Sequence, residues 1–212
     1  MPLDLAAFWS ALDAVPVPDD AEALYDASAE GTLRRGNLDR YLRLLADAGS
    51  TVLLVAEAPG WRGMTNTGLP FVSVRELDAR PGIVTGAAEG DGFARPPEPT
   101  APWEASSRVV WAALRDWAGP LPVAWPVYPH HPFAAPDRRT NRTPRPAEVR
   151  AGAPATLALL EALRIDDVVA VGRKAQGALA TAGIDAVAVR HPAQGGARQF
   201  TDQLAAFSAA VR

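Results

Sequence analysis

Four short apolar runs divide the chain, and each has the length of a buried strand. They are residues 51–56, 121–128, 167–172 and 184–190. Between them lie segments with apolar residues three and four positions apart, which is the spacing of an amphipathic helix. Strands that alternate with helices predict a parallel sheet with helices on both faces. We therefore expect an α/β fold of three layers, α/β/α, around a central four-stranded parallel sheet.

The helices are expected over residues 3–15, from Asp19 or Asp20 through Tyr25, from an N-cap at Asn37 to Gly49, and over residues 106–117, 147–163, 174–182 and 197–211. Residues 58–102 are rich in proline and glycine, and they predict a mostly irregular but ordered loop, with possible short strands or turns near Val72 and residues 83–84. We expect residues 1–212 to form one domain, with residues 1–36 as a helical extension packed on it.

The carboxyl ends of the four strands predict the place of a binding site. Right-handed crossovers put all four ends at one edge, where ligands bind in open α/β sheets. The loops that start at Glu57, Pro129, Arg173 and His191 would gather there. Pro126 cannot donate a backbone hydrogen bond to a neighbouring strand, so we expect it at the end of its strand or facing outward.

Composition narrows the possible chemistry. The chain has no cysteine, which excludes disulfides, thiolate nucleophiles, iron–sulfur clusters and cysteine-based zinc sites. The net charge of -3 argues against a basic nucleic-acid binder as a whole, although residues 138–150 form a basic stretch. Lys174 is the single lysine among arginines, and with the high alanine and proline content this bias indicates GC-rich codon usage. The sequence shows neither a membrane-length apolar run nor a signal peptide, so we expect a cytoplasmic protein.

Three segments at the expected sheet edge together resemble the uracil-DNA glycosylase superfamily, over roughly residues 50 to 205. The sequence 56–60, Ala-Glu-Ala-Pro-Gly, followed by Gly-Leu-Pro-Phe at 68–71, is similar to the first motif of the family 4 type. Residues 141–148 are similar to its Asn-Arg-x-Pro segment, and His191-Pro192 stands at the position of the His-Pro motif. Family 4 members hold an iron–sulfur cluster with four cysteines, which this chain lacks. The uracil-recognising Asn of the family would align with Pro126.

The resemblance implies roles for the residues of these motifs. Phe71 would stack on a flipped base, with a core Phe under a loop as the alternative. His191 would donate a hydrogen bond to the uracil carbonyl, with an ordinary hydrogen-bonded loop His as the alternative. Glu57 would orient water or contact the base edge, unless backbone amides of the turn satisfy it. Ala58, Pro59 and Gly60 would line the base pocket.

Further candidates flank these motifs. His130 and His131 are possible substitutes for the missing Asn, with a solvent-facing pair as the alternative. The DNA-contact candidates are Arg138, Arg142, Pro144 and Arg145 in the basic stretch, which otherwise forms a solvated face, and Gln194 and Arg198, which follow the His-Pro motif where the superfamily inserts an apolar wedge. Arg198 is equally suited to a helix surface. No metal site is expected.

The resemblance thus predicts a base excision repair glycosylase, acting as a monomer without cofactor or metal. It would hydrolyse the N-glycosidic bond of uracil or another deaminated base in DNA after base flipping. Because Pro126 replaces the expected Asn, the alternative is a non-catalytic module of the same fold that binds uracil or damaged DNA. An unrelated α/β enzyme acting on small molecules is a third possibility.

Overall fold

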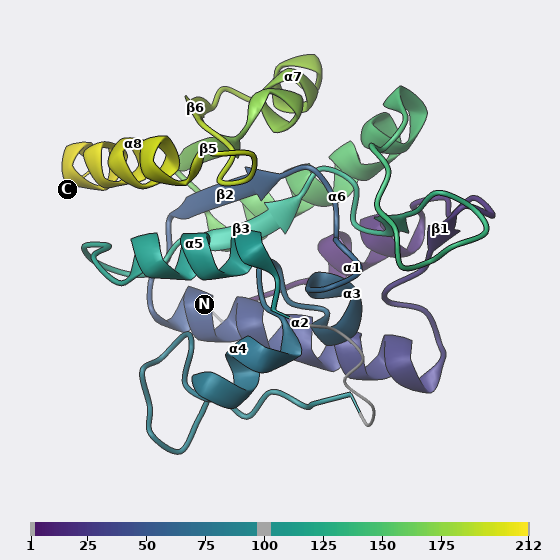
Figure 1. Ribbon diagram of the computed structural model, residues 1–212, viewed down its shortest axis with the longest axis horizontal. Helices are drawn as coiled ribbons and strands as arrows, with labels where there is room; N and C mark the ends of the chain where they lie inside the picture. The colour runs from purple at the N-terminus through teal and green to yellow at the C-terminus, as the bar shows by residue number, and fades with distance from the viewer. Residues whose placement is uncertain (1–2, 97–102, 212) are drawn as a thin grey trace.

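The centre of the molecule is a four-stranded parallel sheet with helices on both faces (Figure 1). The computed structural model describes residues 3–96 and 103–211. The strands are β2 (Val52–Ala56), β3 (Val123–Pro126), β5 (Asp167–Val171) and β6 (Val187–Val189), in the order β3-β2-β5-β6. Nearly every residue of β2, β3 and β5 is buried, because helices cover both faces of the sheet. The expected three-layer α/β/α fold is confirmed.

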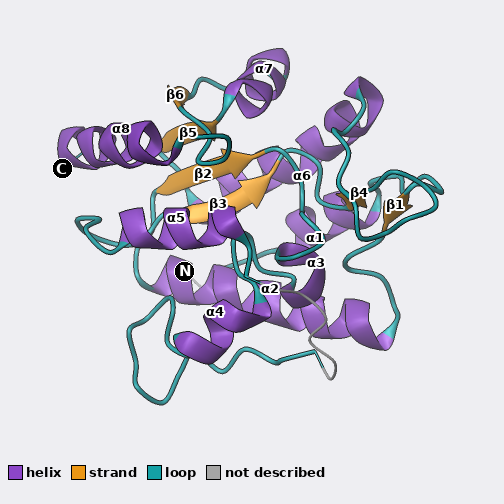
Figure 2. Cartoon of the chain, viewed as in Figure 1, coloured by secondary structure: helices purple, strands orange, loops and turns teal. Residues whose placement is uncertain are grey.

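The helices divide between the two faces of the sheet (Figure 2). One face carries α5 (Ala105–Leu114), which leads into β3, and α8 (Ala197–Ala210), which packs against α5. The other carries α6 (Pro146–Leu163) and α7 (Arg173–Thr181), together with α1 (Ala6–Asp13), which packs on α6. The long helix α2 (Ala29–Asp47) covers the free edge of β3, where the backbone N–H of Ala124 donates to the Tyr41 hydroxyl over 2.9 Å. None of the described helices is long and apolar enough to cross a membrane.

The N-terminal segment differs from its predicted structure in two places. The short helix expected after Asp19 or Asp20 is instead the strand β1 (Ala21–Glu22), which pairs antiparallel with β4 (His131–Pro132). Helix α2 begins eight residues before the expected Asn37, and the Ser28 hydroxyl caps it by accepting from the Gly31 N–H over 3.0 Å. Asn37 itself is buried inside the helix. Its amide donates to the carbonyls of residues 67 and 94 and accepts from the N–H of residue 94.

The described part of the long segment after β2 is ordered, as expected, and it also contains two short helices that were not predicted. These are α3 (Met64–Thr67) and α4 (Val74–Ala79). The second begins at a capping box in which Glu76 accepts from the Ser73 N–H over 3.0 Å. Residues 83–84 lie in a turn. The part of the expected loop at residues 97–102 lies outside the described residues.

The sheet topology sets the place of the site. From β2 the chain crosses to β3 on one side, whereas from β5 it crosses to β6 on the other. A crevice forms where adjacent strands have connections that leave in opposite directions, and ligands bind there in open α/β sheets. By this rule the crevice is expected between the ends of β2 and β5. Pro126 is the last residue of β3, paired with Ala56, as its missing N–H predicts.

Candidate functional site

An ion pair bridges this crevice. Glu57 follows β2, and its Oε1 lies 2.9 Å from Nζ of Lys174, the second residue of α7. The Lys174 ammonium also donates to the Thr143 hydroxyl, in the Asn-Arg-Thr-Pro segment before α6. The contacts join loops that follow three different strands. Both charged side chains are partly exposed, so the pair serves to place the Glu57 carboxylate more than to stabilise the fold.

His191 lies beside this pair, at the end of β6. Gly172 has φ 88°, and a side chain there would lie 3.0 Å from Cβ of His191, so the close approach requires glycine. The N–H of Ala193 donates to Nδ1 of His191 over 3.1 Å. In the neutral ring the proton is therefore on Nε2, which donates to no partner among residues 3–96 and 103–211. Burial lowers the pKa of His191, partly opposed by Glu57 and reinforced by Arg190 and Lys174, so the ring is neutral at neutral pH.

A small cavity of about 40 Å³ lies between the β2 loop and the end of β3. Its wall includes residues that the sequence placed in a base pocket, namely Ala58, Pro59, Gly60 and Phe71, and also Pro126 and Glu104. A larger hollow of about 440 Å³ lies away from the strand ends, and charged residues such as Arg34, Arg138 and Arg139 line it. The smaller cavity fits a base pocket better, because it adjoins the strand ends and is lined by Phe71 and the Ala-Pro-Gly turn after β2.

Phe71 has an unusual backbone conformation. Its φ is +56°, in the left-handed region that bulky L-residues rarely adopt. The Trp111 indole N–H donates to the Phe71 carbonyl over 2.9 Å and helps to hold this conformation. Such strain costs about 1–3 kcal/mol and is concentrated at ligand sites. The half-buried ring contacts the core and reaches the cavity.

Asn141 links the Asn-Arg-Thr-Pro segment to the loop after β2. Its Oδ1 accepts from the Trp61 N–H over 3.1 Å and lies 3.3 Å from Nε2 of His131. The same His131 nitrogen lies 3.0 Å from the carbonyl oxygen of Thr140, so the proton sits on Nε2 and His131 donates to both oxygens. His131 thereby orders the segment that presents Thr143 to Lys174.

The two histidines after β3 are buried, so the solvent-facing alternative is wrong. Nδ1 of His130 accepts from the Leu24 N–H over 3.3 Å, and its ring packs edge-on against Tyr128. Burial lowers the pKa of His130 to about 4. Neither histidine lines the cavity beside Pro126. Their contacts suit them to holding the loop after β3 rather than to recognising a base.

Two candidate DNA-binding arginines are engaged in an ion-pair network formed by Asp20, Arg142, Arg145 and Glu148. Arg142 lies 2.9 Å from Asp20 and 2.6 Å from Glu148, and Arg145 contacts the same two carboxylates. These arginines hold the pKa of Asp20 well below its usual range. Only 16% of the Arg142 side chain is exposed, against 53% for Arg145, and Pro144 between them is buried. Arg142 therefore stabilises the fold through these ion pairs, and few of its N–H groups remain to bind a phosphate.

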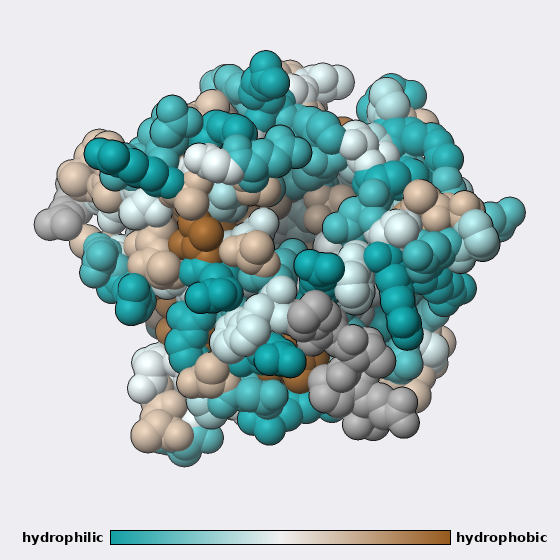
Figure 3. All heavy atoms as spheres, viewed as in Figure 1, coloured by the Kyte–Doolittle hydropathy of each residue, from teal (hydrophilic) through white to brown (hydrophobic). Residues whose placement is uncertain are grey.

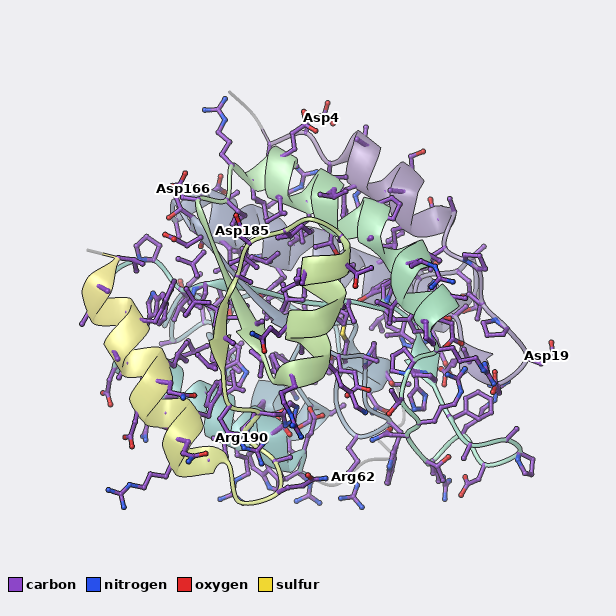
Figure 4. The ribbon with its side chains drawn as sticks, turned by 90° about the horizontal axis from the view of Figure 1, so that it is seen from above. Asp4, Asp19, Arg62, Asp166, Asp185 and Arg190 are labelled. Atoms are coloured by element: carbon purple, nitrogen blue, oxygen red, sulfur yellow. The ribbon has the colours of Figure 1, made fainter. Side chains whose placement is uncertain are left out.

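The remaining candidates are exposed. Arg138 lies over the Phe133 ring, and Arg198 is almost fully exposed, 3.7 Å from Asp202. Gln194 is exposed, with φ 53°. Viewed from above, Arg62 and Arg190 lie on one side of the molecule, while Asp166 and Asp185 lie toward the other (Figure 4). The aspartates precede β5 and β6 and so lie toward the amino edge of the sheet, whereas Arg62 and Arg190 lie toward the carboxyl edge.

Four residues of the site were not identified from the sequence: Lys174, Thr143, Asn141 and Glu104. The first could have been found, because the single lysine of the chain stands directly after a predicted strand end. Thr143 and Asn141 lie inside the recognised segment, but their partners are far away in sequence. Glu104 carries no local signal, since a glutamate before a helix is common.

Known proteins resemble this chain in sequence pattern and in fold. A family model described as the uracil DNA glycosylase superfamily matches residues 44–212. The fold is similar to the crystal structure of wild-type SMUG2 from Pedobacter heparinus, with a TM-score of 0.61 and 15% identity over 93% of this chain and 92% of that one. No curated protein matches the sequence.

Proposed function

Because the chain belongs to the uracil DNA glycosylase superfamily, we propose that it hydrolyses the N-glycosidic bond of uracil, or of another deaminated base, in DNA. The observation that carries the proposal is that three elements lie at the same edge of the sheet. They are the Glu57–Lys174 pair, His191 with a free Nε2–H, and the cavity walled by Phe71. Together they supply the parts that the reaction needs.

The reaction begins with a nucleotide flipped out of the DNA stack. The base would stack on Phe71, and a stacking contact of this kind contributes about 1–3 kcal/mol. The bond between the base and C1′ of the sugar then breaks, and negative charge develops on the base carbonyls. The neutral His191 ring is suited to donate a hydrogen bond to that charge without adding one of its own.

Water completes the hydrolysis. Its oxygen bonds to C1′, and its proton ends on the departing base. We assign the positioning of this water to Glu57, because its carboxylate accepts hydrogen bonds and stands in the crevice between β2 and β5. Lys174 and Thr143 fix the carboxylate there. All of these groups come from one chain, so a monomer suffices for the reaction.

The surface around the site is suited to a polyanion. Arg62 and Arg190 share the side of the molecule that carries the strand ends (Figure 4). The view of Figure 3 shows mostly hydrophilic residues with small hydrophobic patches between them. Because the net charge is -3, binding would depend on this local distribution and would weaken as salt screens it.

A direct assay tests the proposal. The protein is incubated with single- and double-stranded oligonucleotides that contain uracil, hypoxanthine or xanthine, and alkali then breaks the strand at each abasic site. We expect strand breaks with the wild type, strongly reduced breaks with Glu57→Gln, and unchanged breaks with Glu161→Gln, an exposed control on α6. No strand breaks from the wild type on all three bases would refute the enzymatic function.

A second function has one observation in its favour. Pro126 ends β3 beside the cavity and supplies no side-chain hydrogen bond where the family has an Asn. A non-catalytic module would bind uracil-containing or abasic DNA in a salt-dependent way without cutting it. Gain of cleavage by Pro126→Asn in an inactive wild type would support this alternative, and binding no tighter than to undamaged DNA would exclude it.

A further inference from the structure

Glu104 faces the same cavity from the start of α5. It lines the cavity together with Phe71 and Pro126. A side chain at Gly60 would lie 3.2 Å from Oε1 of Glu104, and one at Gly63 would overlap Oε2. Both glycines therefore let the loop backbone lie directly against this carboxyl group. The first of them belongs to the segment that lines the proposed base pocket.

The surroundings of Glu104 shift its protonation equilibrium toward the neutral form. The Ser107 hydroxyl, on the first turn of α5, donates to Oε2 over 2.5 Å. The charged groups that face the carboxyl are Glu76 of α4 and Arg62 of the β2 loop. Burial raises the pKa of Glu104, Glu76 raises it further, and the hydrogen bond from Ser107 and the charge of Arg62 only partly oppose them.

A neutral carboxylic acid has the hydrogen-bonding groups that Pro126 lacks. It presents one O–H donor and one carbonyl acceptor, and a primary amide likewise presents a donor and an acceptor. The Watson–Crick edge of uracil carries an N–H donor beside a carbonyl acceptor, so one acid group can pair with both. An ionised carboxylate only accepts, and it would repel the carbonyl oxygen.

We propose that the Glu104 carboxyl group recognises the N–H and carbonyl edge of the flipped base in place of an amide at position 126. The inference rests on the proposed function and specifies its substrate class. The bases that fit have an N–H beside a carbonyl, as uracil, hypoxanthine and xanthine do. Adenine and cytosine lack this edge, whereas thymine and guanine share it. The role is one of base recognition, with bond cleavage left to His191 and Glu57.

The test compares Glu104→Gln, Glu104→Ala and the exposed control Glu89→Gln in single-turnover cleavage of a uracil oligonucleotide between pH 5.5 and 9. We expect wild-type cleavage to fall on the alkaline side as the acid ionises. Glu104→Gln should keep the neutral-pH rate and lose this alkaline fall, because an amide does not ionise. Glu104→Ala should cleave about 10²-fold more slowly at every pH, the usual cost of one lost donor at such a site.

The proposal is overturned if Glu104→Ala cleaves as fast as the wild type, or if Glu104→Gln keeps the alkaline fall. A purely structural role would lower the melting temperature of both variants and leave Glu104→Gln as slow as Glu104→Ala. An inactive wild type would refute the glycosylase function alone. In that case, the binding of a labelled uracil oligonucleotide tests the inference. Binding should weaken in Glu104→Ala and persist in Glu104→Gln. Equal binding by the wild type and both variants would refute the inference.

Discussion

The buried His130 should make the free energy of unfolding decrease as the pH is lowered. The ring is only 5% exposed, and its pKa is lowered to about 4 from an ordinary 6.5. Between these values the unfolded chain binds a proton that the folded chain excludes, so the free energy of unfolding falls as pH falls. Each pH unit in this range costs about 1.4 kcal/mol. From pH 7 to pH 5 the loss is about 2 kcal/mol, and below pH 4 it levels off near 3 kcal/mol.

Urea unfolding of the wild type and of His130→Asn at pH 7 and pH 5 measures this loss. The asparagine oxygen can replace Nδ1 as acceptor for the Leu24 N–H, but asparagine does not titrate. Other groups with shifted pKa values, such as His191 and Asp20, are common to both proteins and cancel in the comparison. We expect the wild type to lose about 2 kcal/mol more than the variant between the two pH values.

Parallel losses in the two proteins would refute this account of His130. The same pair of proteins also tests where the histidine acts. Because His130 contacts Leu24 and Tyr128 rather than the cavity, His130→Asn should cleave uracil DNA at pH 7 at nearly the wild-type rate. A loss of 10²-fold at unchanged stability would instead place it among the groups that contact the base.

Other changes separate residues that act on the substrate from residues that hold the fold. His191→Ala should slow single-turnover cleavage of uracil DNA by about 10²- to 10³-fold, and an unchanged rate would contradict its role as donor. Phe71→Ala should lower kcat/KM about 5- to 150-fold through lost stacking, measured against thymine DNA as the unreactive control. Arg138→Ala should reduce the salt dependence of DNA binding by about one unit, whereas Arg142→Ala should leave it unchanged and lower the melting temperature. A chain of residues 37–212 should fail to unfold cooperatively in urea, and a sharp transition would contradict a single domain.

The central strands β2 and β5 were predictable because they are buried on both faces. Continuous apolar runs such as residues 51–56 and 167–172 have few alternatives, and the structure places β2 and β5 within them. The long helices follow from their own apolar spacing and caps in the same way. Pro146, for example, begins α6 because the first helical position needs no N–H.

The errors arose where distant contacts decide the role of a polar residue. Asp20 is of a residue type that often caps helices, but its carboxylate instead binds Arg142, which lies 122 residues later in the sequence. Asn37 was expected to cap a helix, but it lies inside one and binds backbone groups 30 and 57 residues away. Glu104 belongs to the same class, since only the fold brings it to Gly60. Local patterns carry no information on such pairs.

The segment before the family match helps to build the site. The match begins at residue 44, yet Asp20 binds Arg142, and Glu22 lies 3.7 Å from His131 and pairs with it in the β1–β4 ladder. These contacts hold the Asn-Arg-Thr-Pro segment from outside, and that segment in turn presents Thr143 to Lys174. We therefore propose that residues 1–212 form one domain, with residues 1–36 as an integral part. Without them the lysine would lose the partner that orients it toward Glu57, and the carboxylate would no longer be fixed in the crevice.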